Sequence, residues 1–161
     1  MSFYEIENEI SIKHQFKNHL KIKSMKRNAT AVWKGSVKEG NGQLTTQSTT
    51  LNNTQYSFKS RFEEGVGTNP EELIAAAHAG CFTMQLSAYL SEEGFQIENI
   101  ESKCVIDLID GAIVTSHITI SAKIKDITDE VFQQHVTKAE KNCPISKLLN
   151  AAISTDATLI A

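Results

Sequence analysis

The segment from Asn69 to Gly94 constrains the fold more than any other part of this 161-residue chain. Asn69 is a good helix N-cap, Pro70 suits the first helical position, and Glu72 follows at the spacing of a capping box. Apolar side chains then recur at helical spacing up to Gly94, which is typical of a helix end: Leu73, Ile74, Ala77, Cys81, Met84 and Ala88. The very small side chains of 75–80 (AAAHAG) allow close packing on every side. We therefore predict a central helix here, the most buried one in the fold.

The sequence before this helix has β character. Residues 29–37 and 43–51 flank the segment 39–42 (EGNG), whose Asn-Gly pair is typical of a hairpin connection. A third strand is predicted over 55–62 (QYSFKSRF), followed by a loop over 63–67. These three strands are expected to form an antiparallel meander.

The sequence after the helix predicts a second β region and two further helices. Alternation places Ile100, Cys104, Ile106 and Leu108 on one face of a strand. The remaining predicted elements are, in order, a strand over 98–109, a hairpin turn at 110–111, a strand over 113–125, a helix over 129–141, a short helix over 144–149 and a strand over 152–160. The order βββ-α-ββ-α-α-β indicates an α+β fold with antiparallel sheets around the central helix.

Composition narrows the class of protein. The length suits one domain that buries roughly 70% of its unfolded surface. A net charge of −3 and only two arginines argue against nucleic acid as a partner. The sequence has no run of 18 apolar residues and no secretory leader pattern, so we expect a cytoplasmic protein that does not span a membrane. Residues 1–24 are interpreted as an N-terminal arm before a domain over 25–161, and Met25 is an alternative start.

Three cysteines are candidates for chemistry, and their odd number and wide spacing argue against a disulfide framework or a zinc motif. Cys81 lies ten residues after Glu71, too deep in the helix for the helix dipole to lower its pKa much, so a reactive thiolate there needs a cation from elsewhere. Cys143 precedes Pro144 at a helix break, where free N–H groups favour a thiolate, although a tight helix corner is an equal alternative. Cys104 is interpreted as a core residue.

Three further side chains each have two possible roles. Arg61 is either a surface ion-pair partner or a guanidinium that stabilises a thiolate. Glu71 either compensates the helix dipole or holds Arg61 through a bidentate pair. His78, three residues before Cys81, either packs or hydrogen-bonds in the core, or forms a Cys-His hydrolase or metal pair. His117 and His135 have no partner at ligand spacing in the sequence and stay unassigned.

Two stretches, 67–82 (GTNPEELIAAAHAGCF) and 142–146 (NCPIS), resemble the OsmC/Ohr family of thiol peroxidases. The His-Ala-Gly-Cys context and the Gly-Thr-Asn-Pro-Glu-Glu run are closer to the OsmC branch, osmotically inducible protein C, than to the organic hydroperoxide reductase branch. The segments 31–35 (AVWKG) and 56–62 (YSFKSRF) also fit, so that the resemblance spans about 27–160.

The resemblance implies an intertwined homodimer with two sites at the subunit interface. By position, Cys81 matches the peroxidatic cysteine and Cys143 the resolving cysteine. Arg61 matches the arginine that activates the thiolate, and Glu71 the glutamate that orients this arginine. Cys104 has no equivalent in the family pattern. The N-terminal arm departs from the usual length, and we hypothesise that it wraps the dimer.

The resemblance also implies a function in oxidative or osmotic stress defence. The protein is expected to reduce organic hydroperoxides, and hydrogen peroxide more weakly, through a Cys81 sulfenic acid and a Cys81–Cys143 disulfide. A dithiol, with a lipoyl-type dithiol as one candidate, is expected to reduce the disulfide, and no metal or other cofactor is needed. The alternative is a non-catalytic dimeric ligand-binding or stress-associated protein on the same fold; a Cys-His hydrolase ranks well behind both.

Overall fold

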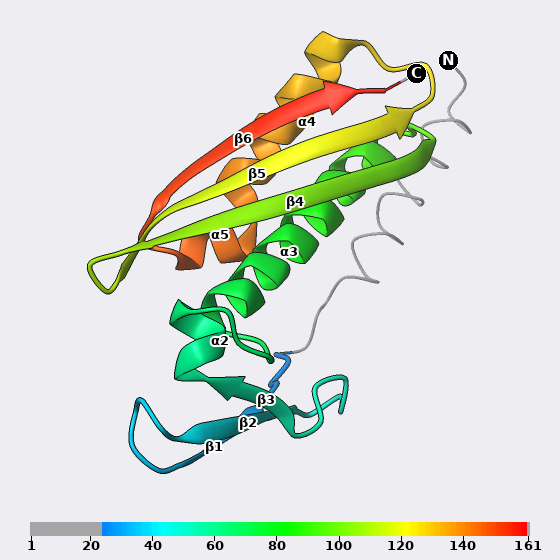
Figure 1. Cartoon of the computed structure of the whole chain (residues 1–161). Helices are drawn as coiled ribbons and strands as arrows, with labels where there is room; N and C mark the ends of the chain where they lie inside the picture. The colour runs from blue at the N-terminus through cyan, green and yellow to red at the C-terminus, as the bar shows by residue number, and fades with distance from the viewer. Residues whose placement is uncertain (1–23, 161) are drawn as a thin grey trace, which may run out of the picture.

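The computed structural model describes residues 24–160 (Figure 1). The arm predicted for residues 1–24 lies outside these residues apart from Ser24, so the boundary at residue 25 stays a prediction. The described elements are, in order, β1 (Ala29–Lys34), β2 (Asn41–Thr46), β3 (Thr54–Ser57), α2 (Phe58–Phe62), α3 (Pro70–Glu92), β4 (Ile97–Ile109), β5 (Ala112–Ile124), α4 (Asp129–Asn142), α5 (Pro144–Leu148) and β6 (Ala152–Leu159).

The elements form two separate three-stranded sheets, with strand orders β1-β2-β3 and β4-β5-β6. The α+β prediction is therefore confirmed. Helices α3, α4 and α5 cover one face of the β4-β5-β6 sheet, and the smaller sheet lies with α2 beyond the N-terminal end of α3 (Figure 1). The cysteine-bearing helix thus extends from the small sheet along the length of the large one.

The first hairpin differs from its prediction in the position of its turn. The strand β2 already begins at Asn41, so Asn41 and Gly42 pair within the sheet and the connection is formed by 35–40. A side chain at Gly42 would collide with the rings of Tyr56 and Trp33, which explains the glycine at this strand position. β2 also ends at Thr46, where the chain turns back through a hydrogen bond from the Thr46 N–H to the Leu51 carbonyl.

The strand predicted over 55–62 is wrong in its second half, because a helix replaces it. Ser57 ends β3 and caps α2: its hydroxyl accepts from the Ser60 N–H (3.1 Å), and the Ser60 hydroxyl accepts from the Ser57 N–H (2.9 Å). Such local bonds compete with a sheet ladder for the same backbone groups. Arg61 consequently lies on a short helix and not at a strand end.

The start and end of the predicted central helix are confirmed. The Asn69 side chain accepts from the Glu72 N–H (2.8 Å), while the Glu72 carboxylate accepts from the Thr68 hydroxyl (3.1 Å) and leaves the reverse half of the capping box unformed. Gly94, at φ +86°, follows the helix end. The conformation beyond a helix terminus favours glycine at such a φ.

The helix α3 is buried along one face only. His78, Phe82, Leu86 and Leu90 recur every fourth residue and are buried against the sheet. On the opposite face of the single chain, the positions Ala76, Gly80, Met84 and Ala88 are exposed, with Met84 76% accessible. The close packing predicted on every side is therefore absent within one chain. We call the three small positions among them, Ala76, Gly80 and Ala88, the small-residue stripe, which Met84 interrupts.

The length and composition of α3 would also allow it to span a membrane, alone among the helices of residues 24–160. Its buried face, however, lies along the sheet and contributes Phe82, Leu86 and Leu90 to the hydrophobic core. A core helix of a folded domain meets the same length and composition criteria, so they do not indicate membrane insertion here.

The second hairpin is as predicted, and the last strand is not. Asp110 (φ +50°) and Gly111 (φ +80°) form the two-residue turn between β4 and β5, whose strands pair antiparallel. β6 pairs with β5 in parallel, which corrects the prediction of antiparallel sheets throughout. The reason is the connection: α4 and α5 form a crossover on one face of the sheet and return the chain to the end at which β5 began.

The core lies between the sheet and the three helices. It contains Ile118, Ile120 and Ala122 from β5, Phe132, Val136 and Ala139 from α4, the buried face of α3, and Cys143 at the junction of α4 and α5. Cys143 is fully buried in this cluster. Its environment is therefore set by the packing of α3 against the crossover.

Candidate active site

The sequence-predicted residues meet in two pairs, of which Arg61 and Glu71 form the first. The Arg61 Nε donates to both Glu71 carboxylate oxygens (3.2 and 3.1 Å), and Nη2 donates to one of them at 2.6 Å. The bidentate pair between α2 and the first turn of α3 is therefore present. The hydrogen bond from Arg61 lowers the pKa of Glu71 below its usual value, and the same bond raises the pKa of Arg61.

This pair faces solvent in the single chain. The Arg61 side chain is 38% accessible and that of Glu71 16%. The guanidinium also lies 4.9 Å from the ring centroid of Phe62, itself an exposed side chain. Held by both a carboxylate and an aromatic face, the arginine presents a fixed positive charge to whatever covers this surface.

Cys81 and Cys143 form the second pair. Cys143 ends α4 and begins α5, and half-buried Cys81 packs against the core cluster that contains Cys143. The Cys143 side chain and the backbone N–H of Ile145, in the first turn of α5, both lie close enough to Cys81 to shift its pKa. All three cysteines of the chain are free thiols. Two thiols 62 positions apart in sequence thus lie close together where α5 packs on α3.

The environment of Cys81 within one chain does not favour a thiolate. Burial raises the pKa of Cys81 most, the Cys143 side chain raises it further, and only the Ile145 N–H lowers it. No basic side chain among residues 24–160 contributes to this pKa shift. The cation that the mid-helix position of Cys81 calls for is therefore absent from its immediate surroundings in the single chain.

The two pairs are separated along α3. Glu71 and Cys81 lie ten residues apart on one helix, which corresponds to about 15 Å at 1.5 Å per residue. The structure therefore brings Arg61 to Glu71 and Cys143 to Cys81, but it does not bring Arg61 to Cys81 within one chain.

His78 is a hydrogen-bonded core residue. Its side chain is fully buried, with Nδ1 2.7 Å from the Ser116 hydroxyl and Nε2 2.8 Å from the Ser146 hydroxyl. Because both ring nitrogens face serine hydroxyls, neither is available as a base for Cys81. This arrangement contradicts the Cys-His hydrolase pair and agrees with the alternative of hydrogen bonding in the core.

Cys104 packs against the core as predicted, with its sulfur 3.2 Å from the Ser116 hydroxyl. Burial raises the pKa of this thiol. Within residues 24–160, its polar neighbours are His78 and Ser116, so Cys104 belongs to the His78 network and is not hydrogen-bonded to the cysteine pair.

Sequence reasoning missed Ser146 and the Ile145 N–H. A signal existed: His78 precedes Cys81 by three residues, and Ser146 follows Cys143 by three. On packed helices, residues three apart lie on one face. Two cysteines close together therefore place His78 and Ser146 near one another, but only once that proximity itself is known.

The remaining candidates lie elsewhere. His117 contacts Ser154 (2.8 Å) and Asp156 (3.3 Å) on the strands β5 and β6, and His135 contacts Glu93 at 3.1 Å. Within residues 24–160, no group of three or more His, Cys, Asp or Glu side chains lies close enough to hold a metal ion.

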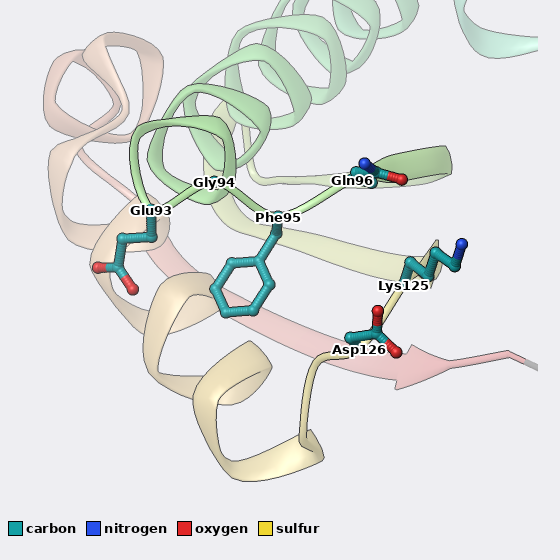
Figure 2. Close-up of a pocket in the computed structure, with 6 residues that line it drawn as sticks. All are labelled: Glu93, Gly94, Phe95, Gln96, Lys125 and Asp126. Carbon is teal, nitrogen blue, oxygen red and sulfur yellow. The ribbon is translucent and has the colours of Figure 1, made fainter.

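An open pocket of about 270 Å³ lies at the C-terminal end of α3. Figure 2 shows the six residues that line it: Glu93, Gly94, Phe95, Gln96, Lys125 and Asp126. It begins twelve residues beyond Cys81, or about 18 Å along a helical path. This pocket is therefore separate from both residue pairs.

Comparisons with known proteins identify the family of the chain. The family model described as "OsmC-like protein" matches residues 63–158. The chain is 39% identical over 130 residues to peroxiredoxin OsmC of Escherichia coli, which covers 78% of this chain and 91% of that protein. It is 35% identical over 88 residues to the organic hydroperoxide resistance protein OhrB of Bacillus subtilis, covering 53% of this chain and 64% of that protein.

Solved structures share the fold. An OsmC-like protein from Mycoplasma pneumoniae superposes with a TM-score of 0.69 at 11% identity, covering 86% of this chain and all of that one. The crystal structure of OhrB from Bacillus subtilis superposes with a TM-score of 0.58 at 25% identity, covering 81% of this chain and 98% of that one. With a family model that matches most of the chain and a relative 39% identical over most of both lengths, the chain belongs to the OsmC family.

Proposed function

We propose that the protein is a thiol peroxidase that reduces organic hydroperoxides through Cys81 and Cys143. The observation that carries this proposal is the proximity of the two thiols: Cys81 packs against the core cluster that contains Cys143, although the two lie 62 positions apart in sequence. Relatives named as a peroxiredoxin and as organic hydroperoxide resistance proteins support the same chemistry. Cys81 is half-buried and Cys143 fully buried, which suits attack by the first and resolution by the second.

The chemistry proceeds in two steps. The Cys81 thiolate attacks one oxygen of the hydroperoxide, the O–O bond breaks, the substrate leaves as an alcohol after taking up a proton, and Cys81 becomes a sulfenic acid. Cys143 then attacks the sulfenic sulfur, the S–O bond breaks, and water leaves as the disulfide forms. An external dithiol returns two electrons and regenerates both thiols. The cytoplasm, where thiols are kept reduced, suits such a cycle.

The functional unit in this proposal is a homodimer, in which Arg61 and Glu71 of one copy face Cys81 of the other. The support is geometric. Antiparallel packing of two α3 helices about Ala76, the midpoint between positions 71 and 81, aligns Glu71 of one copy with Cys81 of the other. Ala76 belongs to the small-residue stripe, whose side chains permit close helix approach. The exposed guanidinium then supplies the cation that Cys81 lacks in the single chain.

The substrate class is supported by the apolar side chains beside the arginine. Phe62 is 53% accessible and its ring lies against both Arg61 and the ring of Phe58. A guanidinium next to aromatic rings suits a peroxide with an organic tail better than hydrogen peroxide, because the tail gains apolar contact and the arginine stabilises the leaving oxygen.

The test is treatment of the fully reduced protein with one equivalent of cumene hydroperoxide, followed by intact mass and non-reducing peptide mapping. We expect a Cys81–Cys143 disulfide and a free Cys104. If all three thiols stay free, the peroxidase proposal is wrong and a non-catalytic dimeric ligand-binding protein takes its place.

A further inference from the structure

We propose that His78 is a positioning residue that fastens α5 to α3, so that the hydrogen bond between Ser146 and its ring holds Cys143 and the Ile145 N–H beside Cys81. This inference deepens the proposed function and rests on it for its catalytic meaning. The positioning itself concerns the two thiols and can be measured without peroxide.

Apart from the buried Cys143 at its N-cap and Ile145, which packs against the core, the short helix α5 has little else to hold it. It contains five residues, its N-cap Cys143 makes no side-chain capping bond, and Leu148 near its end is 75% accessible. Ser146 is the buried side chain of this helix. A helix this short is not stable by itself, so its position depends on its few tertiary contacts. The bond between Ser146 and His78 is the polar contact that ties it to α3.

The ring is fixed from both sides. Ser116 on β5 faces Nδ1, and Ser146 on α5 faces Nε2, so one imidazole joins the sheet, the central helix and the crossover. Burial lowers the pKa of His78, which keeps the ring neutral with one donor and one acceptor nitrogen. Each serine hydroxyl can supply the complementary role, and among the described residues no buried side-chain N or O atom lacks a partner.

The position of the His78 ring affects the surroundings of Cys81. On α3, Cys81 lies one turn beyond His78; on α5, Ser146 lies one turn beyond Cys143. The helices α3 and α5 are therefore linked at two neighbouring places: by the hydrogen bond between His78 and Ser146, and by the packing of Cys81 beside Cys143. Loosening the first allows α5 to move away, which removes both the Ile145 N–H and the resolving thiol from Cys81.

The test compares Ser146→Ala with Ser116→Ala, two changes that each remove one hydroxyl from the same ring. In a Cys104→Ser background, diamide oxidises Cys81 and Cys143 to a disulfide without peroxide. We expect Ser146→Ala to slow this step about fivefold, the effect of losing one hydrogen bond that holds the reactive geometry, and Ser116→Ala to change it less than about twofold.

A second readout is the pH profile of Cys81 alkylation by iodoacetamide in a Cys104→Ser, Cys143→Ser background. Ser146→Ala should move the alkylation pKa upward, because the Ile145 N–H no longer meets the sulfur, and Ser116→Ala should leave it in place. Equal effects of the two serine changes on both readouts, or no effect of Ser146→Ala on either, would overturn the proposal.

A second pair of variants keeps the test valid if a serine change unfolds the protein. The amide of His78→Asn occupies the region of Nδ1 and retains Ser116, whereas the longer His78→Gln reaches the region of Nε2 and retains Ser146. We expect the Asn variant to slow the disulfide step about as much as Ser146→Ala does, and the Gln variant to keep it near the wild-type rate; the reverse order contradicts the proposal. If wild-type protein ignores cumene hydroperoxide, the proposed function fails, while the diamide and alkylation results still decide the role of His78.

Discussion

The two residue pairs at the two ends of the candidate site differ in charge and in burial. The Arg61–Glu71 pair is charged and partly accessible, and its bidentate bonds are complete within one chain. The Cys81–Cys143 pair has no cation among the groups that shift the Cys81 pKa and lies against the core, where burial raises that pKa. A thiol that must be both dry and ionised cannot obtain its cation from a dry core without a large desolvation cost. Locating the charge on the surface of one protomer and the thiol near the core of the other, as proposed here, avoids that cost.

The largest expected effect comes from the thiol itself. Cys81→Ser should abolish peroxide consumption, because the attacking sulfur is gone, and Cys104→Ser should leave turnover nearly intact. Peroxide loss in the presence of a dithiol measures both. If peroxide consumption survives Cys81→Ser, then Cys81 is not the thiol that attacks the peroxide.

The next effect concerns the charged end. Arg61→Ala should slow peroxide attack by about 100-fold, since it removes a cation that stabilises both the thiolate and the leaving oxygen. The alkylation pKa of Cys81 in the dimer should rise at the same time. Arg61→Lys is the matched control: it keeps the charge but loses the bidentate geometry, and should fall between wild type and Ala. If the alkylation profile of Cys81 is unchanged in Arg61→Ala, then Arg61 does not stabilise the Cys81 thiolate.

A hybrid dimer sharpens the comparison further. Cys81→Ser and Arg61→Ala chains should each be inactive alone but complement one another when co-refolded, because the intact arginine of the first then faces the intact thiol of the second. Random pairing gives about a quarter of the wild-type number of complete sites, since half of the two-fold dimers are hybrids with one good site each. No recovery in verified hybrids would show that each chain uses its own arginine.

The smallest effect is on stability and depends on pH. The pKa of Glu71 is lowered in the fold, so its pair with Arg61 contributes its full stability above the usual carboxyl pKa and loses it as pH falls through the lowered value. Because Arg61 is partly exposed, the contribution is at most about 1 kcal/mol. Urea unfolding of wild type and Glu71→Gln should differ by this amount at pH 7 and converge in acid. A difference that persists in acid would mean that Glu71 acts through packing and not through its charge.

Local signals in the sequence predicted the central helix and the second hairpin because their determinants lie within a few residues. Asn69, Pro70 and Gly94 mark the helix ends, and Asp110-Gly111 marks the hairpin turn. The replacement of the second half of the third predicted strand by α2 was missed, although the Ser57–Ser60 spacing was visible, because the surrounding alternation favoured a strand.

Other features depend on tertiary structure. The parallel pairing of β6 follows from the crossover through α4 and α5, which returns the chain to the end of the sheet at which β5 begins, and no short segment encodes this path. The bidentate Arg61–Glu71 pair was predictable from residue type, and the resemblance had assigned the cysteine pair. The contact between His78 and Ser146 spans 68 positions and required the fold.

The crossover that carries Cys143 has a consequence for the unfolded chain. A covalent bond between Cys81 and Cys143 would enclose β4, β5 and α4 in a loop of about 60 residues, which restricts the unfolded ensemble by about 4 kcal/mol in the chain-entropy model. Each turnover would then alternate between a form that unfolds more readily and one that resists heat. The melting temperature should therefore report whether Cys81 and Cys143 are reduced or joined, without any label on the sulfurs.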